Sequence, residues 1–197
     1  MKTMRVKLTL TEEMLGTTSA NKDLHEAYIA SKAPDAKSTE EEIAALGETA
    51  VIEKSMTIFP KEDGRPFLWD YQVKGFFKDA VGMLRNLSDM ECSKIKNYKK
   101  KLDGLLFIEP RRIMIGLAGE MGNCQRPLRA DTMQGPRVAI AHSETVPAGS
   151  EIEFNIKLMD EGLEKAVREC LDYGADRGIG QWRNSGKGRF VWQEIEA

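Results

Sequence analysis

The sequence predicts an α+β fold in which helices cover one face of a mostly antiparallel sheet. Residues 5–10 and 151–158 alternate polar and apolar side chains with the period of two that half-buried strands show. Segments that begin near Asp70 and near Asp160 instead repeat apolar residues at helical spacing. The predicted order is strand, inserted helices, helix, several strands, helix, glycine-rich loop and strand. This order suits a layer of strands with helices on one side.

Length and composition indicate a globular protein. The chain has 197 residues, of which 41% are apolar and 30% charged, and we expect one domain over residues 1–197. No apolar run approaches the roughly 20 residues that cross a bilayer, which excludes a membrane protein. The first residues lack the apolar core of a signal peptide, and three cysteines without CxxC spacing predict reduced thiols. We therefore expect a cytoplasmic protein.

The first half of the chain contains a predicted insertion. It spans about residues 17–60, where capping signals indicate short helices near 21–31 and 38–46. A strand or hairpin arm over 51–59 ends the insertion, and turn residues follow at 62–64. The insertion is expected to interrupt an otherwise continuous domain.

The two best helices are predicted over residues 71–86 and 161–173. Asp160 caps the second helix, which has acidic residues in its first turn and is expected to end at Gly174. Apolar stripes of similar width predict that both helices pack on the same face of the sheet. The residues expected in this packing are Phe77, Val81, Leu84, Leu163, Val167 and Leu171.

Further strands are predicted between and after these helices. One covers residues 105–115 and is broken near Pro110, another covers 137–142, and a short last strand covers 189–195. Together with the two alternating segments, they supply the strands of the expected sheet.

Charge is unevenly distributed along the chain, although its net value is only −2. Residues 74–137 hold 13 basic and 7 acidic side chains, and residues 177–197 are also basic, whereas 1–73 and 138–176 are acidic. If the basic segments fold together, they form a basic face suited to a phosphate-rich partner. The lysine run at 99–101, taken alone, is better explained as a solvated helix face.

The most informative segment is the glycine loop, residues 178–189. Its four glycines follow the pattern G-h-G-x5-G-x-G, which indicates positive φ or very close backbone approach. An ordinary flexible hairpin is the simpler interpretation. The residues between the glycines, however, are donors suited to phosphates or base edges, and Trp182 offers a stacking face. The pattern is neither a P-loop, because the GK[ST] ending is absent, nor a dinucleotide fingerprint, because it follows a helix.

This loop, with the helix before it and the strand after it, resembles the C-terminal half of the RAMP superfamily, the repeat-associated RNA-binding proteins of CRISPR complexes. Residues 8–16, 71–80 and 144–154 are similar to three further segments of that family. The resemblance covers most of the chain outside 17–60 and implies a ferredoxin-like, RRM-related core whose loop and first helix lie along RNA. The family usually has Gly-Ser where this chain has Tyr71-Gln72.

Two functions fit these observations. The first is a non-catalytic, sequence-tolerant RNA-binding or single-stranded nucleic-acid-binding protein of the RAMP type. Family backbone subunits stack along RNA, so the first function implies a homo-oligomer on the ligand. The second is an anti-defence protein of a phage or mobile element, which would inhibit a CRISPR complex or sequester a nucleotide signal. The implied partners are RNA and CRISPR effector subunits, with no cofactor.

The candidate nucleic-acid-binding residues come from the two basic segments and the glycine loop. They are Lys74, Lys78, Arg111, Arg112, Arg126, Arg129, Gly178, Gly180, Gln181, Trp182, Arg183, Asn184, Gly186, Lys187, Gly188 and Arg189.

An enzymatic role has less support in the sequence. Metal-independent RNA cleavage, where it occurs in the superfamily, needs a proton-transferring His, or a Tyr and a Lys, near the scissile phosphate. His142 is the one weak candidate for a general acid or base, whereas His25 fits a solvated position in the insertion. The scattered His and Cys residues have no metal-ligand spacing. We expect a binding protein or, if it is an enzyme, a metal-independent ribonuclease.

Overall fold

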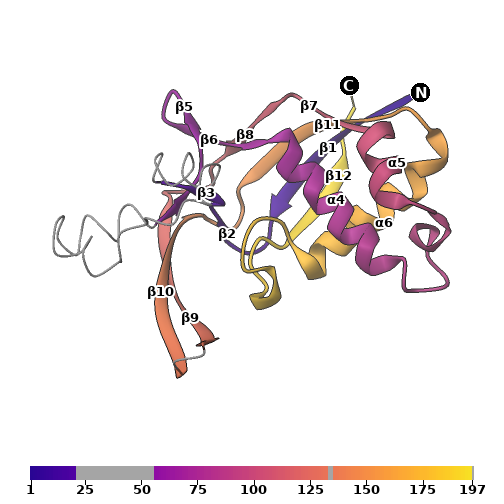
Figure 1. The fold of residues 1–197 in the computed structure, drawn as a ribbon. Coiled ribbons are helices and arrows are strands. Elements are labelled where there is room, and N and C mark those ends of the chain that lie inside the picture. The colour runs from indigo at the N-terminus through magenta and orange to yellow at the C-terminus, as the bar shows by residue number, and fades with distance from the viewer. Residues whose placement is uncertain (21–55, 133–134, 197) are drawn as a thin grey trace, which may run out of the picture.

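The computed structural model describes residues 1–20, 56–132 and 135–196, with only the backbone over 128–139 (Figure 1). The helices expected near 21–31 and 38–46 lie outside the described residues, as does most of the strand expected over 51–59. No helix in the described part of the chain is long and apolar enough to cross a membrane.

The main layer of the protein is a seven-stranded sheet in which all the pairings are antiparallel. The strand order is β12-β1-β11-β8-β6-β5, and β7 also pairs with β11. The mostly antiparallel sheet confirms the predicted fold class. Its strands are β1 (Lys2–Leu10), β5 (Lys61–Glu62), β6 (Arg65–Trp69), β7 (Leu106–Glu109), β8 (Arg112–Gly116), β11 (Glu151–Leu158) and β12 (Phe190–Glu194).

The alternation in β1 and β11 buries one face of this sheet. Met4, Val6, Leu8 and Leu10 of β1 are at most 2% exposed, and every second residue of β11 is buried with them. The intervening residues project from the other face, where Arg5 and Lys7 pair with Glu153 and Glu151 across the strands. The sequence-based expectation for both strands is therefore confirmed.

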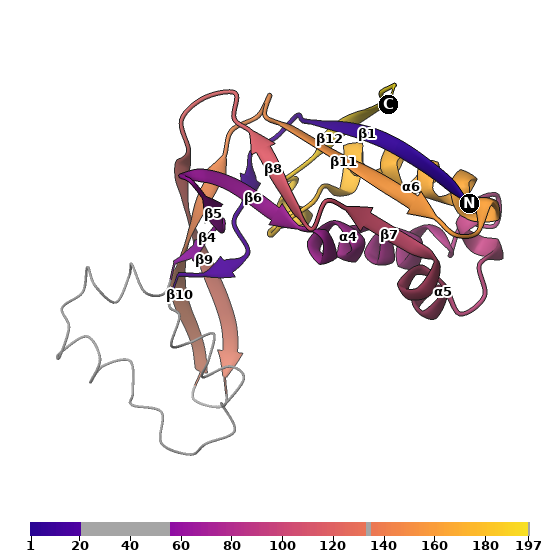
Figure 2. The ribbon, with the colours of Figure 1, turned by 90° about the horizontal axis from the view of Figure 1, so that it is seen from above.

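Helices cover the buried face of the sheet (Figure 2). They are α4 (Asp70–Leu84), α5 (Tyr98–Leu105) and α6 (Glu164–Arg177), with short 3₁₀ segments η1 (Glu91–Lys94), η2 (Glu161–Leu163) and η3 (Arg183–Ser185). The buried stripes of α4 and α6 join one hydrophobic core with the strands. All six residues expected in this packing are buried, which confirms that both helices share one face.

Helix α6 extends past Gly174, where the sequence predicted its end. It continues to Arg177 and is followed by Gly178 with φ 73°. A Cβ on Gly174 would lie 2.1 Å from the Phe190 ring, so the absence of a side chain lets β12 pack against the helix. The glycine serves close packing here rather than helix termination.

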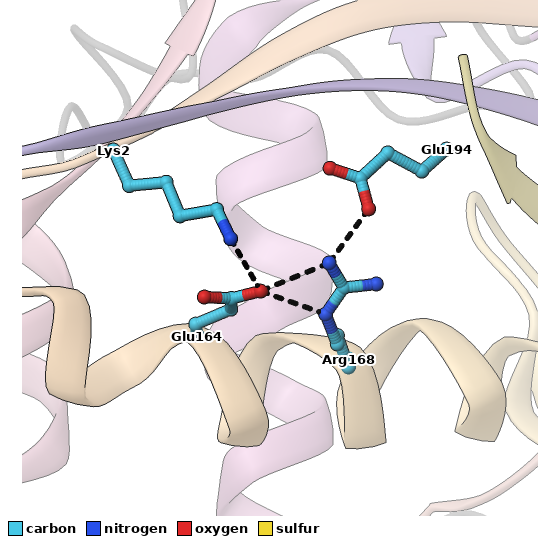
Figure 3. A network of polar contacts seen from close by, with 4 residues as sticks. All are labelled: Lys2, Glu164, Arg168 and Glu194. Atoms are coloured by element: carbon cyan, nitrogen blue, oxygen red, sulfur yellow. Dashed lines mark hydrogen bonds and ion pairs between the residues drawn. The ribbon is translucent and has the colours of Figure 1, made fainter. Parts of the chain in front are cut away.

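A network of charged side chains ties α6 to the sheet (Figure 3). Glu164 accepts hydrogen bonds from Lys2 in β1 at 2.8 Å and from Arg168 one turn along the helix at 3.0 Å. Arg168 also pairs with Glu194 in β12 at 2.6 Å and stacks over the Trp192 ring. The helix is thereby connected to two neighbouring strands.

A second sheet carries a long hairpin that projects from the body (Figure 1). Its members are β2 (Met14–Leu15), β3 (Thr18–Ser19), β4 (Thr57–Ile58), β9 (Gly122–Thr132) and β10 (Gly135–Val146). β9 was not predicted, and β10 is longer than the expected strand at 137–142. β3 pairs with β4, and the Ala20 amide donates to the Met56 carbonyl, so the chain before residue 21 and the chain after residue 55 lie side by side.

All three cysteines are free thiols. Cys92 in η1 and Cys170 in α6 are buried with their sulfur atoms 3.8 Å apart, and Cys124 lies in β9. The contact with Cys92 and burial raise the pKa of Cys170.

Candidate nucleic-acid interface

The glycines of the glycine loop close its neck. All four have positive φ, and the Ile179 amide donates to the Gly188 carbonyl at 2.8 Å. A Cβ on Gly188 would lie 1.8 Å from the Ile179 oxygen, and one on Gly178 would lie 2.5 Å from the Lys187 oxygen. The symmetrical spacing therefore reflects two backbone segments that cross at close range.

Polar side chains bind this loop to the two main helices. Asp79 of α4 accepts from Arg177 at 2.9 Å and from Arg183 at 2.7 Å. Arg177 also donates to Asn184 at 2.7 Å. Arg183 and Asn184 were predicted as ligand contacts, and the structure gives both an internal partner. One carboxylate facing two guanidinium groups still leaves net positive charge at this point.

Two other cations of the loop have internal partners as well. Lys187 forms an ion pair with Glu13, which raises the pKa of the lysine. The Arg189 Nε donates to the Asp176 carbonyl at 3.1 Å. These bonds orient the loop from the sides of β2 and α6.

Arg126 meets the glycine loop from β9. Its Nη2 donates to the Gln181 Oε1 at 2.6 Å, and its guanidinium carbon lies 5.5 Å from the centre of the Trp182 ring. The structure thus brings together three of the predicted residues from segments far apart in sequence. Trp182 adopts a left-handed conformation and is 39% exposed.

A concave pocket of about 510 Å³ lies beside this loop. Its wall consists of residues 17–19, the end of β6 with the first turns of α4, and part of the loop that includes Gly180 and Arg183. The volume falls in the range of roughly 300–1,000 Å³ that small-molecule and cofactor sites occupy. The pocket can therefore accept a group as large as a nucleotide.

Two stacked aromatic rings border the pocket, and sequence reasoning missed both as binding residues. Trp69 and Tyr71 stack with ring centres 6.3 Å apart and planes 13° from parallel. Arg111 lies 5.7 Å and Arg112 5.8 Å from the Trp69 ring. The sequence signals that could have revealed this cluster are the two aromatic residues at 69 and 71 and the arginine pair at 111–112.

Gln72 lines the pocket beside Trp69 and Tyr71. Its Oε1 accepts from the Trp69 amide at 2.8 Å, which caps the start of α4, and its Nε2 donates to Thr17 at 2.5 Å. At the two positions where the RAMP family usually has Gly-Ser, this chain therefore has a stacking ring and a helix cap.

The remaining predicted residues lie elsewhere or are already paired. Lys74 donates to the Asp103 carbonyl at 2.7 Å, and burial lowers the pKa of Lys74. Lys78 pairs with the Asp103 carboxylate and Arg112 with Glu62. Arg129 lies opposite Val138 in the hairpin, where only the backbone is described.

His142, the weak catalytic candidate, lies in β10 opposite Gln125. The Thr57 hydroxyl approaches its carbonyl oxygen at 3.5 Å, and the neighbouring Glu144 is held by the Phe59 amide at 3.0 Å and by Lys61. In the described part of the chain, no three His, Cys, Asp or Glu side chains gather as metal ligands.

Comparison with known proteins yields matches among solved structures only. No family model matches the chain, and no curated protein does. The cryo-EM structure of the type III-B Cmr-beta complex bound to cognate target RNA has a similar chain, with a TM-score of 0.52 and 13% identity. The match covers 99% of this chain and 60% of that one, so this chain spans less than two thirds of its length.

Two further structures are similar at lower TM-scores. A chain of a type IV-B CRISPR complex has a TM-score of 0.49 and 11% identity, over 100% of this chain and 91% of that one. Cmr6 from Pyrococcus furiosus has a TM-score of 0.44 and 12% identity, over 99% and 98%. The fold of this chain therefore resembles that of a chain of the Cmr-beta complex, in agreement with the resemblance that the sequence predicted.

Proposed function

We propose that this chain binds single-stranded RNA along the pocket and the glycine loop, as a component of a CRISPR-type ribonucleoprotein. The similar Cmr-beta structure is described as bound to its target RNA, which supports the proposal. The observation that carries it is the stacked pair Trp69 and Tyr71 at the pocket, with Arg111 beside it.

The chemistry of this cluster suits an unpaired nucleotide. Tyr71 is 59% exposed, so its ring is accessible to a base. Stacking on an aromatic ring contributes about 1–3 kcal/mol per base and tolerates any sequence. Arg111 is exposed and has no ion pair with a carboxylate among the residues described, so its charge is available to a phosphate.

The open face of the sheet is less suited to RNA. RRM domains stack bases on aromatic residues of that face. In this chain, the outward positions of β1 and β11 hold no aromatic residue, and cross-strand pairs join Arg5 with Glu153 and Lys7 with Glu151. The open face thus offers RNA neither stacking rings on β1 and β11 nor unpaired charges at these cross-strand pairs, and the pocket side is the better candidate for the RNA-binding surface.

The proposal is tested by fluorescence anisotropy with a short labelled single-stranded RNA, in a salt series from about 50 mM upwards. Tyr71→Ala is expected to weaken binding roughly 5- to 150-fold, the equivalent of about 1–3 kcal/mol. Arg111→Ala is expected to reduce the salt slope by about 0.7, the value for one phosphate contact on a single strand.

Matched control variants come from α4 and β7. Phe107 is 41% exposed beneath Lys74, and Arg85 is an exposed arginine that stacks on Tyr98. Phe107→Ala and Arg85→Ala are expected to bind like the unmodified protein. Equal losses in test and control variants, or no binding at low salt, would contradict the proposed function.

A further inference from the structure

Arg126 is a buried arginine with unpaired donors. It is 9% exposed, and its Nε and Nη1 are buried with no hydrogen-bond partner among residues 1–20, 56–132 and 135–196. Gln181 accepts the hydrogen bond from Nη2, and no carboxylate in the described part of the chain forms an ion pair with Arg126. A buried guanidinium in this state lacks both a counter-charge and most of its hydrogen bonds.

A second arginine of the chain shows how such a group is ordinarily satisfied. Arg168 also stacks on a tryptophan, at 5.7 Å from the Trp192 ring, but it has two carboxylate partners in Glu164 and Glu194. Arg126 has the tryptophan and no carboxylate partner among the described residues. Arg126 is also the more buried of the two, at 9% exposed against 35% for the Arg168 side chain, so its need for a counter-charge is greater.

Trp182 lies over Arg126 and outside the hydrophobic core. Its ring is 39% exposed and is not among the side chains packed against the hydrophobic core. The residue lies between Gly180 and Gly186, two glycines with positive φ near the apex of the loop. The core contacts that anchor the loop are at its neck, so the ring can leave the guanidinium without opening the fold.

We propose that Arg126 is a covered phosphate site, which a phosphate group of bound RNA reaches when Trp182 moves off the guanidinium. This inference rests on the proposed RNA binding and adds a residue of the projecting hairpin to it. The phosphate oxygens supply the missing negative charge and accept from the free donors. The Trp182 ring is released to stack on a base, which replaces the contact it had with Arg126.

The first test follows the three tryptophans by fluorine NMR on protein labelled with 5-fluorotryptophan, with assignment by Trp→Phe variants. Single-stranded RNA is expected to shift the Trp182 resonance and leave that of Trp192 in place, because Trp192 donates to Asp172 away from the site. Inorganic phosphate is expected to reproduce the Trp182 shift more weakly. An equal shift with chloride at the same ionic strength would overturn the proposal.

The second test compares Arg126→Gln with Arg168→Gln. Arg126→Gln is expected to weaken RNA binding about tenfold or more and to leave the melting temperature unchanged or higher, because a buried unpaired charge is removed. Arg168→Gln is expected to lower the melting temperature and leave RNA affinity unchanged, because it breaks two ion pairs outside the pocket.

The outcomes separate this inference from the proposed function. Suppose that RNA binds, that the Trp182 resonance does not shift, and that Arg126→Gln binds RNA as tightly as the unmodified protein. This result would overturn the covered phosphate site and leave the proposed function intact. If Arg126→Gln has a lower melting temperature and an unchanged RNA affinity per folded molecule, Arg126 stabilises the fold and does not bind phosphate, which also overturns the covered site. Absence of RNA binding by the unmodified protein would overturn both.

Discussion

Gly188 and Gly186 lie two residues apart in the glycine loop and face different surroundings. A Cβ on Gly188 would meet the backbone oxygen of Ile179 at 1.8 Å, whereas one on Gly186 would meet the Arg189 side chain at 3.4 Å. Both have positive φ, 71° and 81°. Gly188 is therefore required for space as well as for conformation, whereas Gly186 is required for conformation alone.

This difference predicts unequal costs of the same substitution. Gly186→Ala is expected to lower the free energy of unfolding by about 1–2 kcal/mol, the cost of left-handed backbone for an L residue. Gly188→Ala is expected to cost about 3 kcal/mol or more, because the Ile179 backbone must also move. Urea unfolding monitored by circular dichroism measures both. Equal losses of unfolding free energy in the two variants would show that the backbone at the neck can shift at little cost, which contradicts the prediction.

The ion pairs between residues far apart in the chain are the part of the candidate site that could not be predicted from the sequence. Arg183 and Asp79 are 104 residues apart in the chain, and Lys187 and Glu13 are 174 apart. The sequence shows which basic residues belong to the glycine loop, but a pattern along the chain does not show which carboxylates will face them. For the same reason the stacked Trp69 and Tyr71, whose value depends on the neighbouring pocket, were missed.

At the scale of elements, helix α6 is held to the sheet by the charge network around Glu164 (Figure 3). Hydrogen bonds from Lys2 and Arg168 lower the pKa of Glu164 from its ordinary value. A carboxyl with a lower pKa in the folded state stabilises the protein above its unfolded pKa, and this contribution disappears as the pH falls through the folded value.

Glu164→Gln is therefore expected to lower the urea midpoint at neutral pH, and the difference from the unmodified protein is expected to shrink in acid below about pH 4.5. Glu120→Gln, in the exposed turn before β9, is a control that should change the midpoint little at any pH. A difference that persists undiminished into acid would show that Glu164 acts through packing rather than charge.

Local signals explain which elements could be predicted. β1, β11 and α4 each bury one face, so their periodicity is visible in the sequence. β9 belongs to a hairpin that projects from the body, and Arg126 is the one buried residue among its residues 122–127, so this part of the strand shows no alternation (Figure 1). The end of α6 was misplaced because Gly174 is required by Phe190, a contact between elements 16 residues apart.

At the scale of the whole molecule, residues from the acidic and the basic segments of the sequence join one hydrophobic core. Some of their charges pair internally: Arg112 of the basic residues 74–137 pairs with Glu62 of the acidic residues 1–73. Charges that stay exposed, such as the lysines at 99–101, remain available to a neighbouring copy. The charge distribution therefore also predicts self-association, because acidic segments of one copy could meet the basic segment of another.

Sedimentation velocity tests this prediction. We expect the protein to form larger species on a long single-stranded RNA at low salt, with masses that rise by whole copies of the chain, and to dissociate as salt screens the contacts. A short RNA that accommodates one copy is the matched control. A monomer that is independent of concentration, with and without long RNA, would contradict self-association.

Strand β1 has a consequence for how the protein is made. Both of its neighbours in the sheet, β11 and β12, come from residue 151 onwards, and Arg5 is 148 residues from its partner Glu153. At translation rates of 5–20 residues per second, β1 waits about 7 to 30 s on the ribosome before its first partner is synthesised. During that interval the apolar face of β1 lacks its partner strands, so we expect chaperones to bind the nascent chain. Pairing over such a distance is also slow to form, so the core is expected to close late in synthesis.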